Sequence, residues 1–231
     1  MTIGSVLDES WTLYTRFFTR FFLVAGAVFL VLNLLTALVY VSLDDEGIGL
    51  ALATLVNAVI AIVGYFWVQG ALVEAAADVH DGKQDLDFGD VFARVRPLLP
   101  ALIVAGLLAG LGIAIGLILL IVPGLYLLTR WALIIPVIVL EKRRAGEAFG
   151  RSHELVKGNG WTVFAIVVIV FLLAAVVGGI ISSILSAVLN DFLGFWLGST
   201  VANAIVTPFV AVTLTVVYLQ LTAGREAAQA A

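Results

Sequence analysis

The sequence lacks cysteine altogether and contains few charged residues. Without cysteine the chain can form no disulfide, no thiolate nucleophile and no cysteine metal site. Charged residues make up 12% of its 231 residues, about half of the roughly 25% that is usual in soluble domains, whereas hydrophobic residues make up 62%. So few polar side chains cannot cover a globule of this size. The composition therefore predicts insertion into a membrane.

Two further features of the composition disfavour other classes of protein. The net charge of −4 argues against a surface that binds nucleic acid, because such surfaces are basic. The N-terminal segment contains Asp8, Glu9 and Arg16, and it has no short apolar core followed by a small-residue cleavage site. We therefore expect no nucleic-acid partner and no cleaved signal peptide.

Long apolar runs predict six transmembrane helices. A helix needs about 20 apolar residues to cross the hydrocarbon core, and the 43-residue run 98–140, whose only charge is Arg130, has about twice this length. We expect Pro123-Gly124 to divide that run, because proline lacks the amide proton and glycine tolerates a tight turn. The predicted spans are residues 21–41, 50–77, 98–122, 125–140, 161–189 and 195–221. The prediction is an all-α polytopic membrane helical bundle that forms a single integral membrane domain over residues 1–231.

The basic residues predict which side of the membrane the loops face. Eleven of the twelve Lys and Arg residues lie before the first span, between the second and third, between the fourth and fifth, or after the sixth. The three remaining connections contain no Lys or Arg. Cytoplasmic loops collect Lys and Arg, whereas acidic residues contribute little to orientation. We therefore expect both the N- and the C-terminus to be cytoplasmic.

A short pattern recurs in three of the predicted cytoplasmic segments. Gly4, Gly89 and Gly146 are each followed at +2, +3 and +9 by apolar or small residues. Each segment predicts a short amphipathic helix, with Ser5 or Asp90 as a plausible N-cap, and a transmembrane hairpin follows each one. We expect a three-fold repeat of an interfacial helix plus a hairpin. The alternative is that short amphipathic helices precede these spans without any repeat.

Recognisable catalytic and metal-binding patterns are missing from the sequence. The two histidines, His80 and His153, lie in different predicted loops, and no metalloprotease, nucleophile-elbow or phosphate-loop motif occurs. An acid-rich loop at residues 81–90 could hold a hard cation, but a solvated loop explains it more simply. Gly158-Asn159-Gly160 is interpreted as a flexible turn into the fifth span. We expect the protein to have no enzymatic activity and no cofactor.

Arg130 is the strongest single candidate for a functional residue. A charge inside hydrocarbon is costly and is a functional-site hypothesis by default. At about 1.5 Å per residue, Arg130 would lie roughly 10 Å from the Pro123 end of its span. Its long side chain would then extend to the outer interface, toward Asp191 or residues 44–46. The alternatives are an anchor for a lipid phosphate or an anionic solute, and a buried structural ion pair.

Two further features concern helix geometry. The predicted fourth span has only 16 residues, and Pro136 should kink it. Interrupted spans can mark transport sites, although a proline kink is also common in ordinary packed helices. In the third span, Gly106-x-x-x-Gly110 and Gly112-x-x-x-Gly116 predict close approach to neighbouring helices, within the chain or in a dimer.

A block of distinctive residues runs through the middle of the chain. Its members are Pro123-Gly124-x-Tyr126, Arg130-Trp131, Pro136, Glu141, Gly146-Glu147-Ala148, Arg151-Ser152 and Leu155-Val156-Lys157-Gly158. The block resembles the membrane domain that is found in some bacterial glycerophosphoryl diester phosphodiesterases and also as stand-alone proteins. Segments near the N-terminus and after Gly70 resemble the same family, so the resemblance extends over nearly the whole chain.

This resemblance implies a helical fold and a location in the bacterial plasma membrane. It marks as candidate binding or structural residues Arg130, Pro123, Gly124, Pro136, Glu141, Arg151 and Ser152. Six spans leave no room in 231 residues for the phosphodiesterase barrel from which the family takes its name. We therefore do not expect phosphodiesterase activity.

Two functions remain in competition at this point. The first is a non-catalytic integral membrane protein that organises membrane lipids or other membrane proteins at the cytoplasmic face. The second is a small transporter or channel for an anionic or lipid-like solute, which would use Arg130 and the kinked fourth span. A third reading, an intramembrane enzyme, is the weakest, because the sequence shows no nucleophile–base pair and no set of metal ligands. The variant Arg130→Gln discriminates between the first two.

Overall fold

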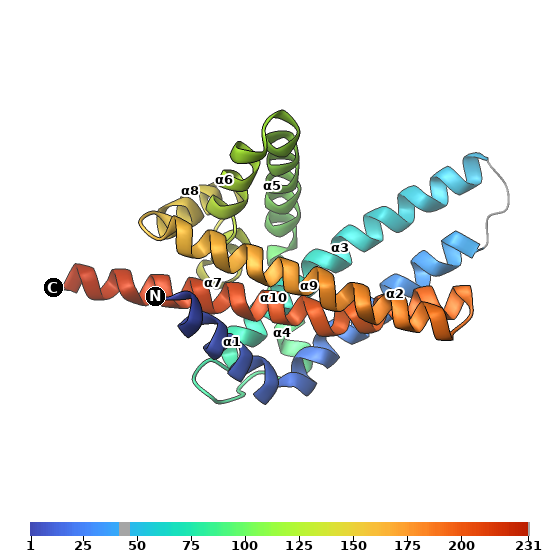
Figure 1. Ribbon diagram of the computed structural model, residues 1–231, viewed down its shortest axis with the longest axis horizontal. Coiled ribbons are helices and arrows are strands. Elements are labelled where there is room, and N and C mark those ends of the chain that lie inside the picture. Colours follow the sequence, from blue (N-terminus) through green and yellow to red (C-terminus); the bar gives the residue numbers. More distant parts are fainter. Residues whose placement is uncertain (42–46, 231) are drawn as a thin grey trace.

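The computed structural model describes residues 1–41 and 47–230, and within these ranges it consists of helices joined by short turns (Figure 1). The elements are α1 (Ile3–Arg16), α2 (Phe18–Val41), α3 (Ile48–Asp78), α4 (Phe88–Val95), the 3₁₀ helix η1 (Arg96–Leu98), α5 (Leu99–Leu119), α6 (Ile121–Arg130), α7 (Ile134–Glu141), α8 (Ala145–Val156), α9 (Gly160–Val188) and α10 (Asp191–Ala230). The predicted all-α fold is confirmed.

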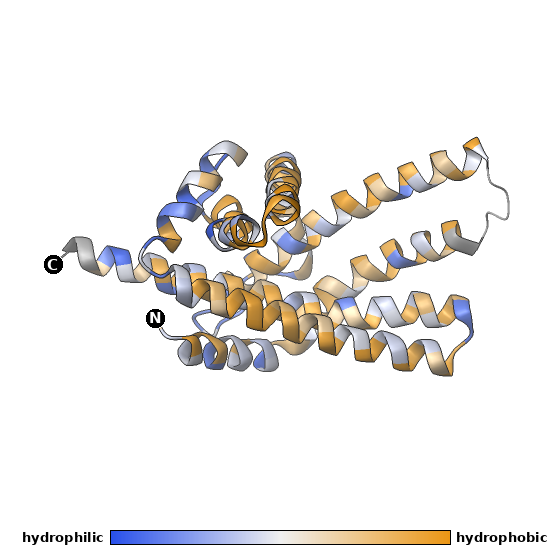
Figure 2. Ribbon diagram, turned by 45° about the horizontal axis from the view of Figure 1, so that its top comes forward, coloured by the Kyte–Doolittle hydropathy of each residue, from blue (hydrophilic) through white to orange (hydrophobic). Residues whose placement is uncertain are grey.

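The described residues contain six segments that are long and apolar enough to cross a membrane. Five of them contain the long helices α2, α3, α5, α9 and α10, and the fourth combines α6 with α7. Figure 2 shows α9 as hydrophobic along most of its length, whereas hydrophilic residues gather around α8 and the C-terminal part of α10. The helices agree with the predicted spans to within a few residues, except at the ends of α10 and around the turn between the third and fourth spans.

The chain repeats the same order of elements three times. A short amphipathic helix, α1, α4 or α8, precedes each hairpin, which is α2–α3, α5 with α6 and α7, or α9–α10. The residues two positions after the three repeat glycines are all fully buried, and so are those six positions after them. These residues are Val6, Val91 and Ala148, and Ser10, Val95 and Ser152. The sequence pattern therefore reflects one buried face of the amphipathic helix in each unit.

The three units close into a ring. Each amphipathic helix packs against the last helix of the preceding unit, so α4 lies on α3, α8 on α7, and α1 on α10. The first long helix of each unit lies beside the returning span of the preceding unit, since α5 contacts α3, α2 contacts α10, and α9 contacts α6, which shares its span with α7. The returning helices α3, α7 and α10 also contact one another in the middle. We call the three contacts between successive units the α3–α5, α6–α9 and α10–α2 seams.

The helix caps differ from the prediction by one turn. Thr2 and Asp87 are the N-caps of α1 and α4, and the predicted N-caps Ser5 and Asp90 lie three residues further on. Their side chains reach back instead, since the amide of Thr2 donates to Ser5 Oγ at 3.2 Å and the amide of Asp87 to Asp90 Oδ2 at 3.4 Å. Such reciprocal bonding satisfies amides that the first helical turn leaves unpaired.

The turn between α5 and α6 lies before Pro123, which corrects the predicted break at Pro123-Gly124. The chain turns at Leu120, and Pro123 is the third residue of α6. Proline is tolerated there because amides of the first turn have no intrahelical acceptor. Gly124 serves close packing, because a Cβ atom on Gly116 would lie 2.9 Å from the Gly124 Cα atom.

The other glycines of α5 mostly serve the predicted close approach. A Cβ atom on Gly106 would collide with the Phe66 ring of α3, and one on Gly112 would collide with Trp131. A Cβ atom on Gly110 would meet nothing within 4 Å. Three of the four predicted positions, Gly116 included, therefore bring α5 close to another part of the same chain.

Candidate functional site

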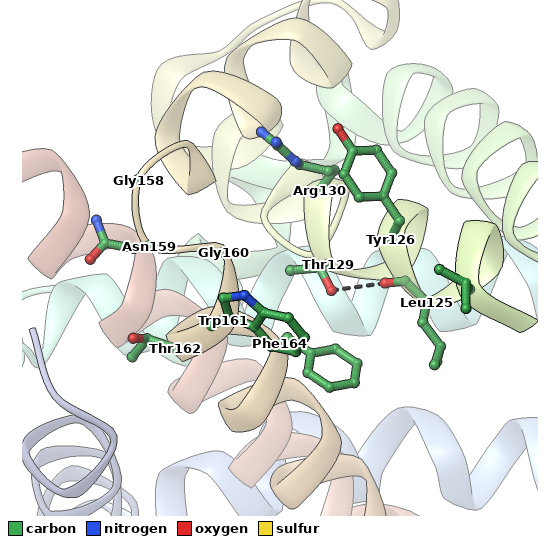
Figure 3. Close-up of a pocket in the computed structure, with 11 residues that line it drawn as sticks. Leu125, Tyr126, Thr129, Arg130, Gly158, Asn159, Gly160, Trp161, Thr162 and Phe164 are labelled. Carbon is green, nitrogen blue, oxygen red and sulfur yellow. Dashed lines mark hydrogen bonds between the residues drawn. The ribbon is translucent and has the colours of Figure 1, made fainter.

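A cavity of about 690 Å³ lies at the α6–α9 seam (Figure 3). Its walls come from α6, from the loop between α8 and α9, and from the first turns of α9. The lining residues are Val122, Leu125, Tyr126, Thr129, Arg130, Gly158, Asn159, Gly160, Trp161, Thr162 and Phe164. Arg130 is the only one of them with a formal charge, and none is a carboxylate, histidine or cysteine. The cavity thus combines apolar walls with one cation.

The guanidinium of this lining lies apart from its most apolar side chains. Figure 3 shows Arg130 beside Tyr126 on α6, and the loop from Gly158 to Gly160 across the gap. Leu125 and Phe164 lie further along the cavity, away from the guanidinium. An occupant that fits such a lining has an anionic or polar end and an apolar body.

Arg130 turns toward α8 and not toward the opposite end of the bundle. Its Nη1 atom lies 3.1 Å from Nε2 of His153 on α8, and its guanidinium lies 5.0 Å from the centre of the Tyr126 ring. A guanidinium can only donate, so Nε2 of His153 must be the acceptor in this contact. Within the described ranges, no carboxylate lies close enough to pair with Arg130.

The predicted direction of the Arg130 side chain, toward Asp191 or residues 44–46 at the outer interface, is therefore wrong. Residues 44–46 lie outside the described residues, but the contact with α8 decides the matter. The physical reason is a break in the fourth span. Because α6 has only ten residues, its C-terminal end at Arg130 already meets α8.

The break lies at Trp131–Leu133, one turn before the predicted kink at Pro136. Pro136 is the third residue of α7. It has no amide proton to donate to the carbonyl four residues earlier, and its ring crowds that carbonyl, so the helix opens on its N-terminal side. The prediction of an interrupted fourth span is confirmed, and its position is corrected.

Ser152 of α8 satisfies the backbone at this break. Its hydroxyl donates to the carbonyl oxygen of Arg130 at 2.8 Å and accepts the amide proton of Leu133 at 3.2 Å. Both groups lose their helical partners where the chain leaves the α6 geometry. Ser152 is fully buried, so no water replaces it. The Ser152 side chain thus fixes the end of α6 and, with it, the backbone of Arg130.

Glu141 ties three helices together at the end of α7. Its carboxylate accepts bonds from Arg143 Nε at 2.6 Å, from Arg151 Nε on α8 at 2.8 Å, and from the Tyr218 hydroxyl on α10 at 3.1 Å. The hydrogen bond to Glu141 raises the pKa of Arg143 above its usual value. This cluster holds α7, α8 and α10 in register.

Of the seven residues marked by the sequence resemblance, Arg130 is the one that lines the cavity. Ser152 supports its backbone, Glu141 and Arg151 join helices, Pro123 and Pro136 begin helices, and Gly124 packs against α5. Sequence reasoning missed the opposite wall, from Gly158 to Phe164. The Gly158-Asn159-Gly160 segment was a usable signal, because small residues leave space that a larger side chain would fill.

The two other seams are filled by side chains of the protein itself. At the α10–α2 seam, Tyr14 packs against Phe209 with ring centres 5.5 Å apart and donates to the carbonyl of Ile205 at 2.9 Å. Burial raises the pKa of Tyr14 to about 12, so its hydroxyl remains a donor at neutral pH. At the α3–α5 seam, Phe66 lies directly against Gly106. The α6–α9 seam is the one that encloses the cavity.

The acid-rich loop is partly ordered by a buried ion pair. Arg20 Nη2 lies 2.8 Å from Asp78 Oδ2, and both side chains are more than nine-tenths buried. The backbone of Leu86 bonds to both of them. In the part of the chain that the structure describes, no three His, Cys, Asp or Glu side chains are grouped to hold a metal ion. The ion pair therefore holds the loop against the N-terminal end of α2 and the C-terminal end of α3.

One comparison with known proteins gives a match. The family model of the membrane domain of glycerophosphoryl diester phosphodiesterase matches residues 98–224, which is more than half of the chain. The match runs from the last residue of η1 into α10 and contains the whole cavity. No curated protein and no solved structure matches the chain.

Proposed function

This chain belongs to the family of the membrane domain of glycerophosphoryl diester phosphodiesterase, and from that premise we propose that it is a non-catalytic protein that holds a membrane lipid in the α6–α9 cavity. Through this cavity it would organise lipid at the cytoplasmic face of a bacterial plasma membrane. The lining supports a binding role, since it offers a cation and aromatic walls but no pair of side chains suited to nucleophilic or acid–base catalysis.

One observation carries this proposal, namely an apolar cavity with a single guanidinium at one end. Side chains at its edge remain exposed on the surface, including Val122, Tyr126 and Trp161. In a membrane protein, exposed apolar side chains of this kind face acyl chains. A lipid chain therefore has a continuous apolar route from the bilayer into the cavity.

The position of the charges supports an orientation with both chain ends in the cytoplasm. Figure 1 shows the N-terminus and the C-terminal part of α10 on the same side of the molecule, away from the α9–α10 turn. Arg130, the one basic residue that the loop count left unassigned, contacts α8, which belongs to the basic segment 142–157. All twelve basic residues thus fit the cytoplasmic side. A reporter fused after Arg144 should be cytoplasmic, and one fused after Glu46 should be outside.

The lipid proposal is tested by filling the cavity. In the purified full chain, native mass spectrometry should detect co-purified lipid, and Leu125→Trp should remove most of it because the larger ring occupies the cavity. Leu119→Trp, the same change at an exposed position on the α5–α6 hairpin, is the matched control. Wild-type protein without bound lipid, or equal retention by both variants, contradicts the proposal.

A small transporter is the second candidate, and the broken α6–α7 span beside the cavity favours it. Reconstituted protein would then move an anionic or lipid-like solute across vesicles, and Arg130→Gln would slow that movement. Transport is rejected if no solute moves, or if the variant moves it equally well.

A further inference from the structure

Building on the proposed lipid site, we infer that the occupant is an anionic phospholipid whose headgroup phosphate binds between Arg130 and the first turn of α9. The proposed function requires only that some lipid fills the cavity. The inference adds the chemical class of its headgroup and names the two elements that select it.

The first support is the charge of the cavity. Its only formal charge is positive, and no carboxylate lies among the lining residues. Nη1 of Arg130 bonds to His153, which leaves Nε and Nη2 without partners among the described residues. A guanidinium with two free donors matches the spacing of two phosphate oxygens.

The second support is the opposite wall of the cavity. Asn159 is the N-cap of α9 but makes no capping bond with its side chain, and the first helical amide with a partner is that of Val163. The amides of Gly160, Trp161 and Thr162 have no acceptor within the helix, and all three residues line the cavity. The positive end of a 29-residue helix dipole therefore adds to the charge of Arg130.

The charge of the lining also disfavours a zwitterionic headgroup such as phosphocholine. A quaternary ammonium group pairs with an acidic side chain or an aromatic face. The cavity has no acid, and the guanidinium of Arg130 already covers the face of Tyr126, which leaves the rings of Trp161 and Phe164. A second cation placed beside Arg130 would be repelled, whereas a headgroup without a cation keeps only its favourable contacts.

The experiment is a competition between lipids that share their acyl chains. The full chain is placed in bilayer discs that contain phosphatidylglycerol and phosphatidylcholine in equal amounts, and retained lipid is counted by native mass spectrometry. Both lipids carry the phosphate, so repulsion between the choline ammonium and Arg130 must supply the discrimination, and a preference of about tenfold for phosphatidylglycerol is expected. Arg130→Gln should bring the ratio close to one while the total retained lipid stays the same. Arg96→Gln, at an exposed arginine outside the cavity, should keep the wild-type preference.

A second variant tests the helix terminus without touching Arg130. Thr162→Pro removes one of the three free amides at the third position of α9. Pro123 and Pro136 already occupy the third positions of α6 and α7, so this helix start tolerates proline. Because the amide would bind the phosphate, the variant should lower the retention of phosphatidylglycerol several-fold, and it keeps the inference testable if Arg130→Gln fails to fold.

Three outcomes separate the inference from the proposed function. Retention of no lipid at all overturns both. The inference is overturned, and the lipid site left standing, by retention of lipid without headgroup preference, by an unchanged preference in Arg130→Gln, or by unchanged retention of phosphatidylglycerol in Thr162→Pro. Thermal stabilisation of lipid-free protein by inorganic phosphate, undiminished by added phosphatidylglycerol, would make free phosphate the ligand and overturn the lipid assignment.

Discussion

The first and third units place the same helices around the same kind of seam, but only the third leaves a cavity there. In both units the long helix begins 14 residues after the repeat glycine, at Phe18 in α2 and at Gly160 in α9. By this count Phe17 corresponds to Asn159. The aromatic side chains of Phe17 and Phe18 in the first unit thus correspond to the amide side chain of Asn159 and to Gly160, which has no side chain, in the third.

The difference shows how a repeated fold acquires a site. The deeper positions of the two helices are equivalent, since Phe21 and Val163 are both fully buried. Only the entrance differs, where Phe18 packs against Tyr14 with ring centres 5.5 Å apart, while Gly160 leaves open space. The core of the repeat therefore maintains the fold, and small residues at one seam create room for a ligand.

The buried serines of these two units should differ most in their effect on stability. Ser152 satisfies two backbone groups of another segment, whereas the hydroxyl of Ser10 donates to Val6 within its own helix at 2.7 Å. Ser152→Ala should lower the free energy of unfolding by about 2–4 kcal/mol, because two buried groups lose their partner. Ser10→Ala should cost less than about 1 kcal/mol. Denaturant unfolding in mild detergent measures both, and equal losses would contradict the assigned role of Ser152.

Restoring the aromatic residue of the first unit should close the cavity. Gly160→Phe introduces the counterpart of Phe18 where a Cβ atom meets nothing within 4 Å. Co-purified lipid should fall by about tenfold or more, since the ring occupies the space of the ligand. Gly179→Phe, at an equally open position of the same helix, serves as the control. Undiminished lipid in Gly160→Phe would show that the lipid binds elsewhere.

Alkaline pH should weaken the packing of Tyr14 at the α10–α2 seam. The folded-state pKa of Tyr14 is about 12, above its usual value of 10.0, because burial disfavours the phenolate. Its contribution to stability is complete below pH 10 and is lost as the pH rises through 12. Between these values Tyr14→Phe should show a smaller decline in unfolding temperature than the wild type. Equal declines in the unfolding temperatures of Tyr14→Phe and the wild type would contradict the role assigned to the Tyr14 hydroxyl at the α10–α2 seam.

The smallest effect is expected at His153, which contacts Arg130 but does not line the cavity. His153→Ala should change the free energy of unfolding by no more than about 0.5 kcal/mol, as is usual for a partly exposed position. Preference for phosphatidylglycerol should persist, because Arg130 keeps its charge. Loss of that preference in the same lipid competition would instead make His153 part of the headgroup site.

Much of the fold follows from local sequence signals. Apolar length identifies the six spans, and the spacing after Gly4, Gly89 and Gly146 identifies the three units, because each pattern reflects a periodic buried face. The turn at Leu120 and the break after Arg130 were misplaced by about one turn. Proline marks a helix disruption in the sequence, but it can begin a helix as readily as end one, and that choice depends on packing.

The candidate site was only half predictable. Arg130 stands out as a charge in an apolar run, and this signal is local. The second wall, from Gly158 to Phe164, becomes part of the site only through packing of α9 beside α6. The role of Ser152 is also invisible in the sequence, because it depends on two backbone groups some twenty residues away. Contacts between units are set by the closed ring and not by any local pattern.

The closure of the ring through α1 and α10 has a consequence for the order of assembly. The helices α1 and α2 are synthesised well before the helix they pack against, since both lie on α10. About 170 residues separate the start of α2 from the start of α10, so at roughly 5–20 residues per second α2 spends about nine to thirty-five seconds without this partner. During that interval the face that later meets α10 is available to other partners in the bilayer. The first unit therefore completes its packing only after α10 has been made.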